Sequence, residues 1–152
     1  MPKKMLVAVD LSKLGQAVVT YGHSLAHRLN VETTFIHVMP AHQLWKGYEP
    51  WFPPNFDTEI REIAEKKIAY FVRKAEEDAP YPEHKSHSIV YASGDPGEQV
   101  IEYAKQHHMD LIVVGYKGQS TLEQLIVGST ASKIARYAPC SVLIYRPGFE
   151  VL

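Results

Sequence analysis

The chain has 152 residues, 45% of them hydrophobic and 22% charged, as in an ordinary folded domain. We therefore interpret residues 1–152 as one domain. The formal charge of −1 shows no excess of basic residues of the kind that binds nucleic acid or an anionic membrane. The apolar run Met5–Val9 is too short for a secretory signal, and no stretch approaches the roughly 18 apolar residues of a membrane span. With Cys140 as the single cysteine, no internal disulfide can form, so we expect a cytoplasmic protein.

Short apolar runs alternate along the chain with segments of helical periodicity. Five runs predict strands, at Met5–Asp10, Thr33–Met39, His87–Ala92, Leu111–Gly115 and Ser141–Tyr145. Apolar residues at three- and four-residue spacing predict a helix in each interval, beginning near Leu14, Ile60, Pro96 and Ala131. This alternation predicts a parallel sheet covered on both faces. With right-handed crossovers it becomes a doubly wound α/β fold of five strands, in the order 3-2-1-4-5, with four helices.

Two helix starts carry recognisable capping residues. Asp95 can cap the third helix, Pro96 suits its first position, and Glu98 can close a capping box. Ser12 can cap the first helix. The connection Pro40–Phe56 is long and rich in proline and aromatic residues. It is either an ordered surface loop that packs on its own aromatic rings, or a lid or partner surface beside a ligand.

A glycine-containing loop follows the predicted fourth strand. It reads Gly115–Gly118, then nine residues, then Gly128–Thr130 at the start of a helix. Free amides at a helix start can bind phosphate, and glycine lets the backbone approach an anion closely. Ser129 and Thr130 offer a cap or hydroxyl donors, and Lys117 either adds a positive charge or faces water. The loop matches neither a Walker A motif nor G-x-G-x-x-G, so a phosphate site and a structural turn both remain open.

Asp10 supports the interpretation of the glycine loop as a phosphate site. It ends the first predicted strand, which neighbours the fourth strand at the point where the strand order reverses. Ligands of such sheets bind in that cleft, so Asp10 and Gly115 are expected to face it together. A carboxylate there can accept both ribose hydroxyl protons, although Asp10 could instead cap the first helix.

These residues together resemble the ATP-binding branch of the universal stress protein family. The resemblance rests on G-x2-G-x9-G-[ST] after a strand and on the carboxylate at Asp10. It extends over nearly the whole chain outside residues 40–56, through the segments VAVDLS, ETTFIHVMP, SGDPGEQVIEYAKQHHMDLIVVG and APCSVLIYRP.

The resemblance implies a Rossmann-like fold of the adenine nucleotide alpha hydrolase-like kind. It implies that Asp10 contacts the ribose, and that the Val38 backbone recognises adenine with Ala8 nearby. The phosphates would be held, with a bridging Mg²⁺, by Gly115, Gly118, Gly128, Ser129 and Thr130. It also implies a homodimer through Ser141–Tyr145, an apolar edge strand that pairing would cover.

Three classes of function follow from these observations. The preferred one is an ATP-binding module that responds to nucleotide, with ADP or AMP as related ligands, and is read by a regulatory partner. The second is a slow ATPase or phosphoryl-transfer enzyme, for which only Asp10 and Lys117 are candidate groups and no base is evident. The third is a stress-protein dimer that binds no nucleotide.

The other reactive side chains have structural explanations. His23 and His27 share a helix face but lack a third ligand, so we predict no resident metal site there. We expect His37 to be a core histidine with a hydrogen-bond partner, and Cys140 to be a buried, inert thiol.

Overall fold

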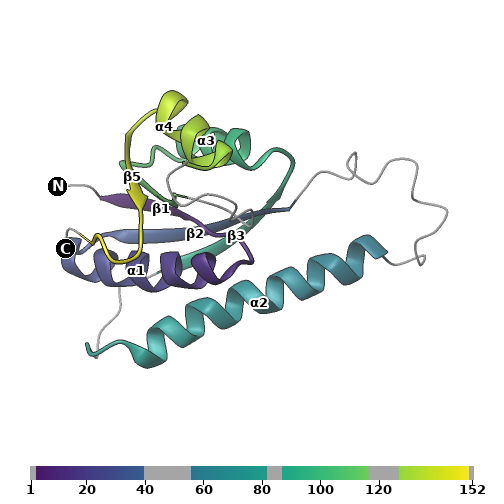
Figure 1. The fold of residues 1–152 in the computed structure, drawn as a ribbon, viewed down its shortest axis with the longest axis horizontal. Coiled ribbons are helices and arrows are strands. Elements are labelled where there is room, and N and C mark those ends of the chain that lie inside the picture. Colours follow the sequence, from purple (N-terminus) through teal and green to yellow (C-terminus); the bar gives the residue numbers. More distant parts are fainter. Residues whose placement is uncertain (1–2, 40–55, 82–86, 117–126, 151–152) are drawn as a thin grey trace.

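The computed structural model describes residues 3–39, 56–81, 87–116 and 127–150. Its five strands form one parallel sheet in the order β3-β2-β1-β4-β5, which confirms the predicted doubly wound topology (Figure 1). The strands are β1 Lys4–Ala8, β2 Glu32–Met39, β3 His87–Ser93, β4 Leu111–Gly115 and β5 Ser141–Tyr145. The helices are α1 Lys13–Leu29, α2 Phe56–Asp78, α3 Pro96–Gln106 and α4 Ser129–Tyr137.

The sheet has a separate apolar core on each face. α1 and α2 cover one face, and α3 and α4 cover the other (Figure 1). Alternation along the strands sends Val7 and Phe35 into the first core and Leu6 and Ile36 into the second, all at most 1% exposed. Burial on both faces is the reason that the strands read as continuous apolar runs. None of the helices that the structure describes is both long and apolar enough to cross a bilayer.

The helix caps predicted at Ser12 and Asp95 are present, but the predicted capping box at Glu98 is not. Ser12 Oγ accepts from the Gly15 N–H at 3.2 Å, and Asp95 Oδ2 accepts from the Glu98 N–H at 3.0 Å. The Glu98 carboxylate, however, does not close a capping box. It contacts Lys133 Nζ on α4 at 3.2 Å, and the same ammonium lies 3.1 Å from Asp95. An ammonium between two carboxylates outcompetes one backbone N–H for the Glu98 side chain.

Two further predictions from the sequence need correction. β1 ends at Ala8 and not at Asp10, because after the bond from the Val9 N–H to the Ile36 oxygen (2.9 Å) the chain turns toward α1. Ile63, which fits the apolar pattern of α2, is 64% exposed. The Pro40–Phe56 connection lies outside the described residues up to position 55, and Phe56 begins α2.

Candidate functional site

The candidate site lies at the carboxyl ends of β1 and β4. Ala8 and Val114 are partners in the register of these two strands. Beyond them the chain leaves β1 for α1 on one face and leaves β4 for α4 on the opposite face (Figure 1). This divergence is the topological switch point, where open parallel sheets bind ligands.

Asp10 is held by the first turn of α1. Its Oδ1 accepts from the Ser12 N–H at 2.9 Å and from the Ser12 hydroxyl at 2.5 Å. Ser12, not Asp10, is the N-cap, so Asp10 orients the capping residue instead of capping the helix. Gly15 is required here, since a Cβ would collide with the Asp10 carbonyl oxygen. Within the described residues, Asp10 Oδ2 has no hydrogen bond.

The start of α4 presents backbone donors at the same edge of the sheet. The Gly128 N–H donates to the Tyr116 oxygen at 2.6 Å, which brings the helix start back to the end of β4. Gly128 is the N-cap, and Ser129 and Thr130 occupy the first turn. The prediction that their hydroxyls cap the helix is therefore wrong, because they lie inside it and the cap has no side-chain hydrogen bond.

The amides of residues 129–131 precede the first helical hydrogen bond. That bond runs from the Ser132 N–H to the Gly128 oxygen at 2.9 Å. No acceptor for the three amides is found within the described residues, and α4 has no acidic residue in its first turn. Three unpaired N–H groups at the positive end of a helix dipole favour an anion.

The other predicted loop residues fall into two groups. Gly115 has a packing role, since a Cβ there would lie 3.1 Å from side-chain carbons of both Leu14 and Val18 on α1. Lys117 and Gly118 lie outside the described residues. Close packing against α1 therefore explains why position 115 is glycine, whether or not a phosphate binds nearby.

Val38 lies near the end of β2, beyond the last register pair of β1 with β2. Val38 lies two residues beyond Ile36, the register partner of Ala8. Within the described residues it has no hydrogen bond to β1. His37 explains this gap: it is 5% exposed, and its Nδ1 lies 2.8 Å from the Val9 carbonyl oxygen. The prediction that His37 is a core histidine with a partner is confirmed.

Arg146 is a cation near this edge that sequence reasoning missed. Its guanidinium lies over the Tyr116 ring, 5.4 Å from the centroid, and the Tyr116 N–H donates to the Tyr145 oxygen at 3.0 Å. Thirty positions separate Arg146 from Tyr116, so only the pairing of β4 with β5 reveals the contact.

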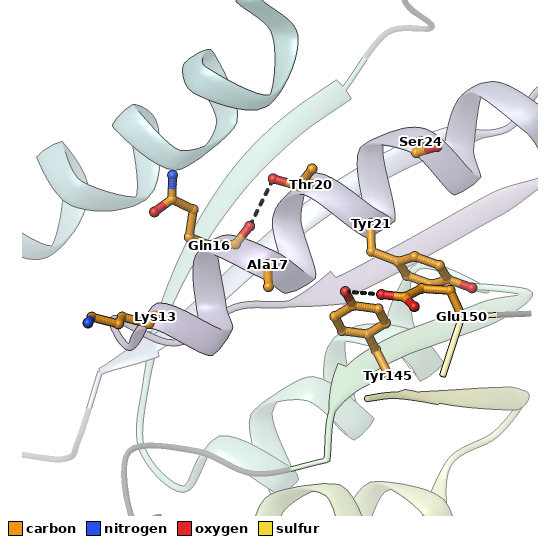
Figure 2. Close-up of a pocket in the computed structure, with 8 residues that line it drawn as sticks. All are labelled: Lys13, Gln16, Ala17, Thr20, Tyr21, Ser24, Tyr145 and Glu150. Atoms are coloured by element: carbon orange, nitrogen blue, oxygen red, sulfur yellow. Dashed lines mark hydrogen bonds between the residues drawn. The ribbon is translucent and has the colours of Figure 1, made fainter. Parts of the chain in front are cut away.

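A separate groove of about 540 Å³ lies between α1 and the segment after β5 (Figure 2). Tyr21 and Tyr145 stack there with ring centroids 4.4 Å apart, and the Tyr145 hydroxyl donates to Glu150 at 2.9 Å (Figure 2). Burial, with the nearby Glu150 carboxylate, raises the pKa of Tyr145 to about 12. The groove runs along the outer side of α1 and lacks the amides and carboxylate of the switch point.

The paired histidines of α1 form part of a ring cluster at the opposite end of the sheet. His23 Nδ1 lies 2.5 Å from the Tyr81 hydroxyl, and the His27 ring stacks on Tyr81 with centroids 3.7 Å apart. His87 Nε2 contacts Glu76 at 3.0 Å. Within the described residues no group of three or more acidic, histidine or cysteine side chains is arranged to hold a metal ion.

Cys140, which the sequence predicted to be buried, is only half-buried and lies just before β5. The pKa of its thiol is raised, mainly by burial and to a smaller extent by the negative charge of Asp110. The thiol therefore stays protonated at neutral pH and is a poor nucleophile.

The chain matches a known protein family over nearly its whole length. The family model described as "Universal stress protein family" matches residues 1–146. The chain belongs to the universal stress protein family. Universal stress protein YxiE of Bacillus subtilis is 31% identical over 147 residues, covering 94% of this chain and 98% of the relative. Family membership agrees with the resemblance seen in the sequence.

Solved structures of family members share the fold. Universal stress protein UspA from Lactobacillus plantarum has 27% identity and a TM-score of 0.71, with 95% of this chain and 97% of that chain covered. A universal stress protein in complex with cAMP has 21% identity and a TM-score of 0.62, with 95% and 97% covered.

Proposed function

We propose that this universal stress protein is a cytoplasmic regulatory module that binds an adenine nucleotide, with ATP as the preferred ligand. The observation that carries the proposal is that, within the described residues, Asp10 Oδ2 and the amides of residues 129–131 have no hydrogen-bond partner and belong to the same switch point. A ribose needs the acceptor, and a phosphate chain needs the donors.

The roles of the individual residues follow from their chemistry. Asp10 Oδ2 accepts from the ribose hydroxyls while Oδ1 stays bonded to Ser12. The backbone of Val38 binds the base near Ala8. Phosphate lies against the start of α4, where Gly128 has no side chain to obstruct it. The proposal also assigns Gly118 and Lys117 to phosphate binding, and a bound Mg²⁺ would neutralise part of the phosphate charge.

Family members give further support for the ligand class. Universal stress proteins have been solved in complex with cAMP, dAMP and AMP, at 21%, 16% and 19% identity to this chain. All three ligands carry adenine, a pentose and phosphate. A site that combines one base edge, one ribose acceptor and one anion site suits that whole class.

The residues favour binding of a nucleotide over its hydrolysis. Efficient phosphoryl transfer needs a base that positions the acceptor and charges that neutralise the γ-phosphate. Asp10 is already bonded to Ser12, and no histidine of the described residues lies among the groups assigned to the phosphates. A slow ATPase remains the alternative, with turnover far below the usual enzyme rate of about 1 per second or more.

The regulatory form is proposed to be a homodimer through β5. One edge of Ser141–Tyr145 pairs with β4, and the other has no partner strand within the described residues. Ile144 is 36% exposed on this strand, and Phe149 just after it is 69% exposed. An apolar strand edge of this kind is usually covered by pairing. Light scattering at micromolar concentration should give the mass of a dimer, and a monomer would refute this part.

Calorimetric titration of the purified protein tests the ligand. ATP, ADP, AMP, cAMP and GTP are each titrated with and without Mg²⁺. We expect saturable binding of adenine nucleotides, and weaker binding of the Asp10→Ala variant because the ribose loses its acceptor. Thr20→Ala, on the exposed side of α1, is the control. Absence of heat with every nucleotide would refute the proposed function, and equal affinity for GTP would refute recognition of adenine.

A further inference from the structure

His37 lies where β1 and β2 separate. Its side chain is buried, and Nδ1 lies 2.8 Å from the Val9 carbonyl oxygen. A carbonyl oxygen can only accept, so Nδ1 carries the proton and donates. This hydrogen bond fixes the orientation of the ring and, in the neutral side chain, the tautomer with a bare Nε2.

The His37 side chain bonds the carbonyl oxygen that the next hydrogen bond of the β1–β2 ladder would use. The last regular bond between the strands runs from the Val9 N–H to the Ile36 oxygen at 2.9 Å. A parallel ladder would continue with the Val38 N–H donating to the Val9 oxygen. No such bond is found within the described residues, and the His37 ring donates to that oxygen instead.

The direction of the Val38 backbone follows from strand geometry. Both hydrogen-bonding groups of one residue point to the same side of a strand, and the side alternates along the chain. The Ile36 oxygen points to β1, and the Met39 oxygen points to β3, where it accepts from the Gly94 N–H at 3.0 Å. The N–H and C=O of Val38 therefore point to the β1 side, beyond the end of that strand.

We infer that His37 is a positioning residue for base recognition. By donating to the Val9 carbonyl, it ends the β1–β2 ladder one rung early and keeps the Val38 N–H and C=O unpaired for a ligand. Adenine presents an amine donor beside a ring-nitrogen acceptor, which complements one C=O and one N–H. Only the link to adenine rests on the proposed function; the early end of the ladder stands without it.

The ladder is tested in the ligand-free protein by nuclear magnetic resonance. We expect long-range spectra of the imidazole to show the proton of His37 on Nδ1. We also expect the Val38 amide to exchange with solvent at least about tenfold faster than the Ile36 amide, since only the latter is in the ladder. A proton on Nε2 alone, or equal protection of the two amides, would overturn the inference without any variant.

Two substitutions then separate the donor from the bulk of the side chain. His37→Leu removes the donor, so the Val38 N–H can bond the Val9 oxygen and its exchange should slow at least about tenfold. His37→Asn keeps an N–H donor at about the reach of Nδ1 and should behave as the unsubstituted protein. Circular dichroism checks that both variants fold.

Nucleotide titration completes the test. For His37→Leu we expect ATP affinity to fall at least about tenfold while affinity for inorganic tripolyphosphate changes less than about twofold, because only the base loses its partners. For His37→Asn we expect ATP affinity within about threefold. If the unsubstituted protein binds ATP and His37→Leu binds it equally well, the inference fails. If the unsubstituted protein binds no nucleotide, the proposed function fails instead.

Discussion

At the amino ends of the strands, side chains hydrogen-bond to one another and to the backbone, whereas at the carboxyl ends several backbone groups have no partner among the described residues. Asp110, just before β4, accepts from the Lys3 and Lys4 N–H groups at 2.9 and 3.0 Å. His23 and Tyr81 are joined near the starts of β2 and β3. At the other end, Val38 and the first turn of α4 have donors without acceptors in the described residues.

The difference indicates where stability and binding reside. A satisfied polar network fixes a structure, while an unpaired buried donor costs free energy until a ligand bonds it. Substitutions at the amino ends should therefore lower the free energy of unfolding and leave nucleotide affinity intact. Substitutions at the carboxyl ends should lower nucleotide affinity and, except where they remove a helix cap, leave the free energy of unfolding unchanged.

Gly128→Val should give the largest effect, a loss of ATP affinity of at least about a hundredfold. Its φ of −61° and ψ of 157° are accessible to valine, so the backbone conformation need not change. The added side chain would obstruct the anion at the amides of α4. Calorimetry measures the affinity, and thermal unfolding measures the stability.

Ser132→Val is the matched control, because it adds a similar side chain to an exposed position one turn later in α4. It should bind ATP normally. If Gly128→Val retains its affinity, the start of α4 is not the phosphate site.

Tyr81→Phe should lower the free energy of unfolding by about 1–2 kcal/mol, because His23 Nδ1 loses the hydroxyl that lies 2.5 Å away. Urea unfolding measures the change. Tyr70→Phe, at a ring that is 45% exposed, is the control and should shift stability by less than about 0.5 kcal/mol. A fall in ATP affinity in Tyr81→Phe would contradict the division between the two ends.

Ser12→Ala should lower both the free energy of unfolding and the affinity for ATP. Loss of the cap on α1 should cost about 1 kcal/mol of stability. Asp10 also loses the hydroxyl that holds Oδ1, so ATP affinity should fall by about threefold as the carboxylate reorients. Urea unfolding and calorimetry measure the two effects, and Thr20→Ala, which removes a hydroxyl inside the same helix, should change neither by more than experimental error.

Asp110→Asn should have the smallest effect, visible mainly in acid. The hydrogen bonds from the Lys3 and Lys4 N–H groups hold the pKa of the Asp110 carboxyl below its ordinary value of 3.8. A lowered folded-state pKa means that the carboxylate stabilises the fold above pH 3.8 and that this contribution is lost as pH falls through the folded-state value.

The asparagine variant should therefore be less stable at neutral pH and lose less stability on acidification. Urea unfolding between pH 7 and pH 3 measures this. Glu62→Gln, at an exposed carboxyl on α2, is the control. A pH profile of Asp110→Asn that parallels the unsubstituted protein would exclude a role for this carboxyl at the amino ends.

Local sequence pattern was sufficient to predict the alternation of strands and helices and the caps at Ser12 and Asp95, because burial on both faces gives apolar strands and a cap needs a side chain only three residues from the amide it bonds. The strand order was predicted from the general rule of right-handed crossovers and not from local pattern. The resemblance carried by the glycine spacing also identified the family. Local pattern placed Asp10 and the start of α4 at one edge, because carboxyl ends of neighbouring parallel strands meet there.

The partners of individual polar groups depend instead on tertiary packing. The pairing of Glu98 with Lys133, the early end of β1, the bond from His37 to Val9 and the approach of Arg146 to Tyr116 all join segments distant in the sequence. Which acceptor a donor finds depends on the distances that packing sets, and alternative partners differ by only about 1 kcal/mol. A pattern of residue types cannot resolve that difference, whereas three-dimensional packing does.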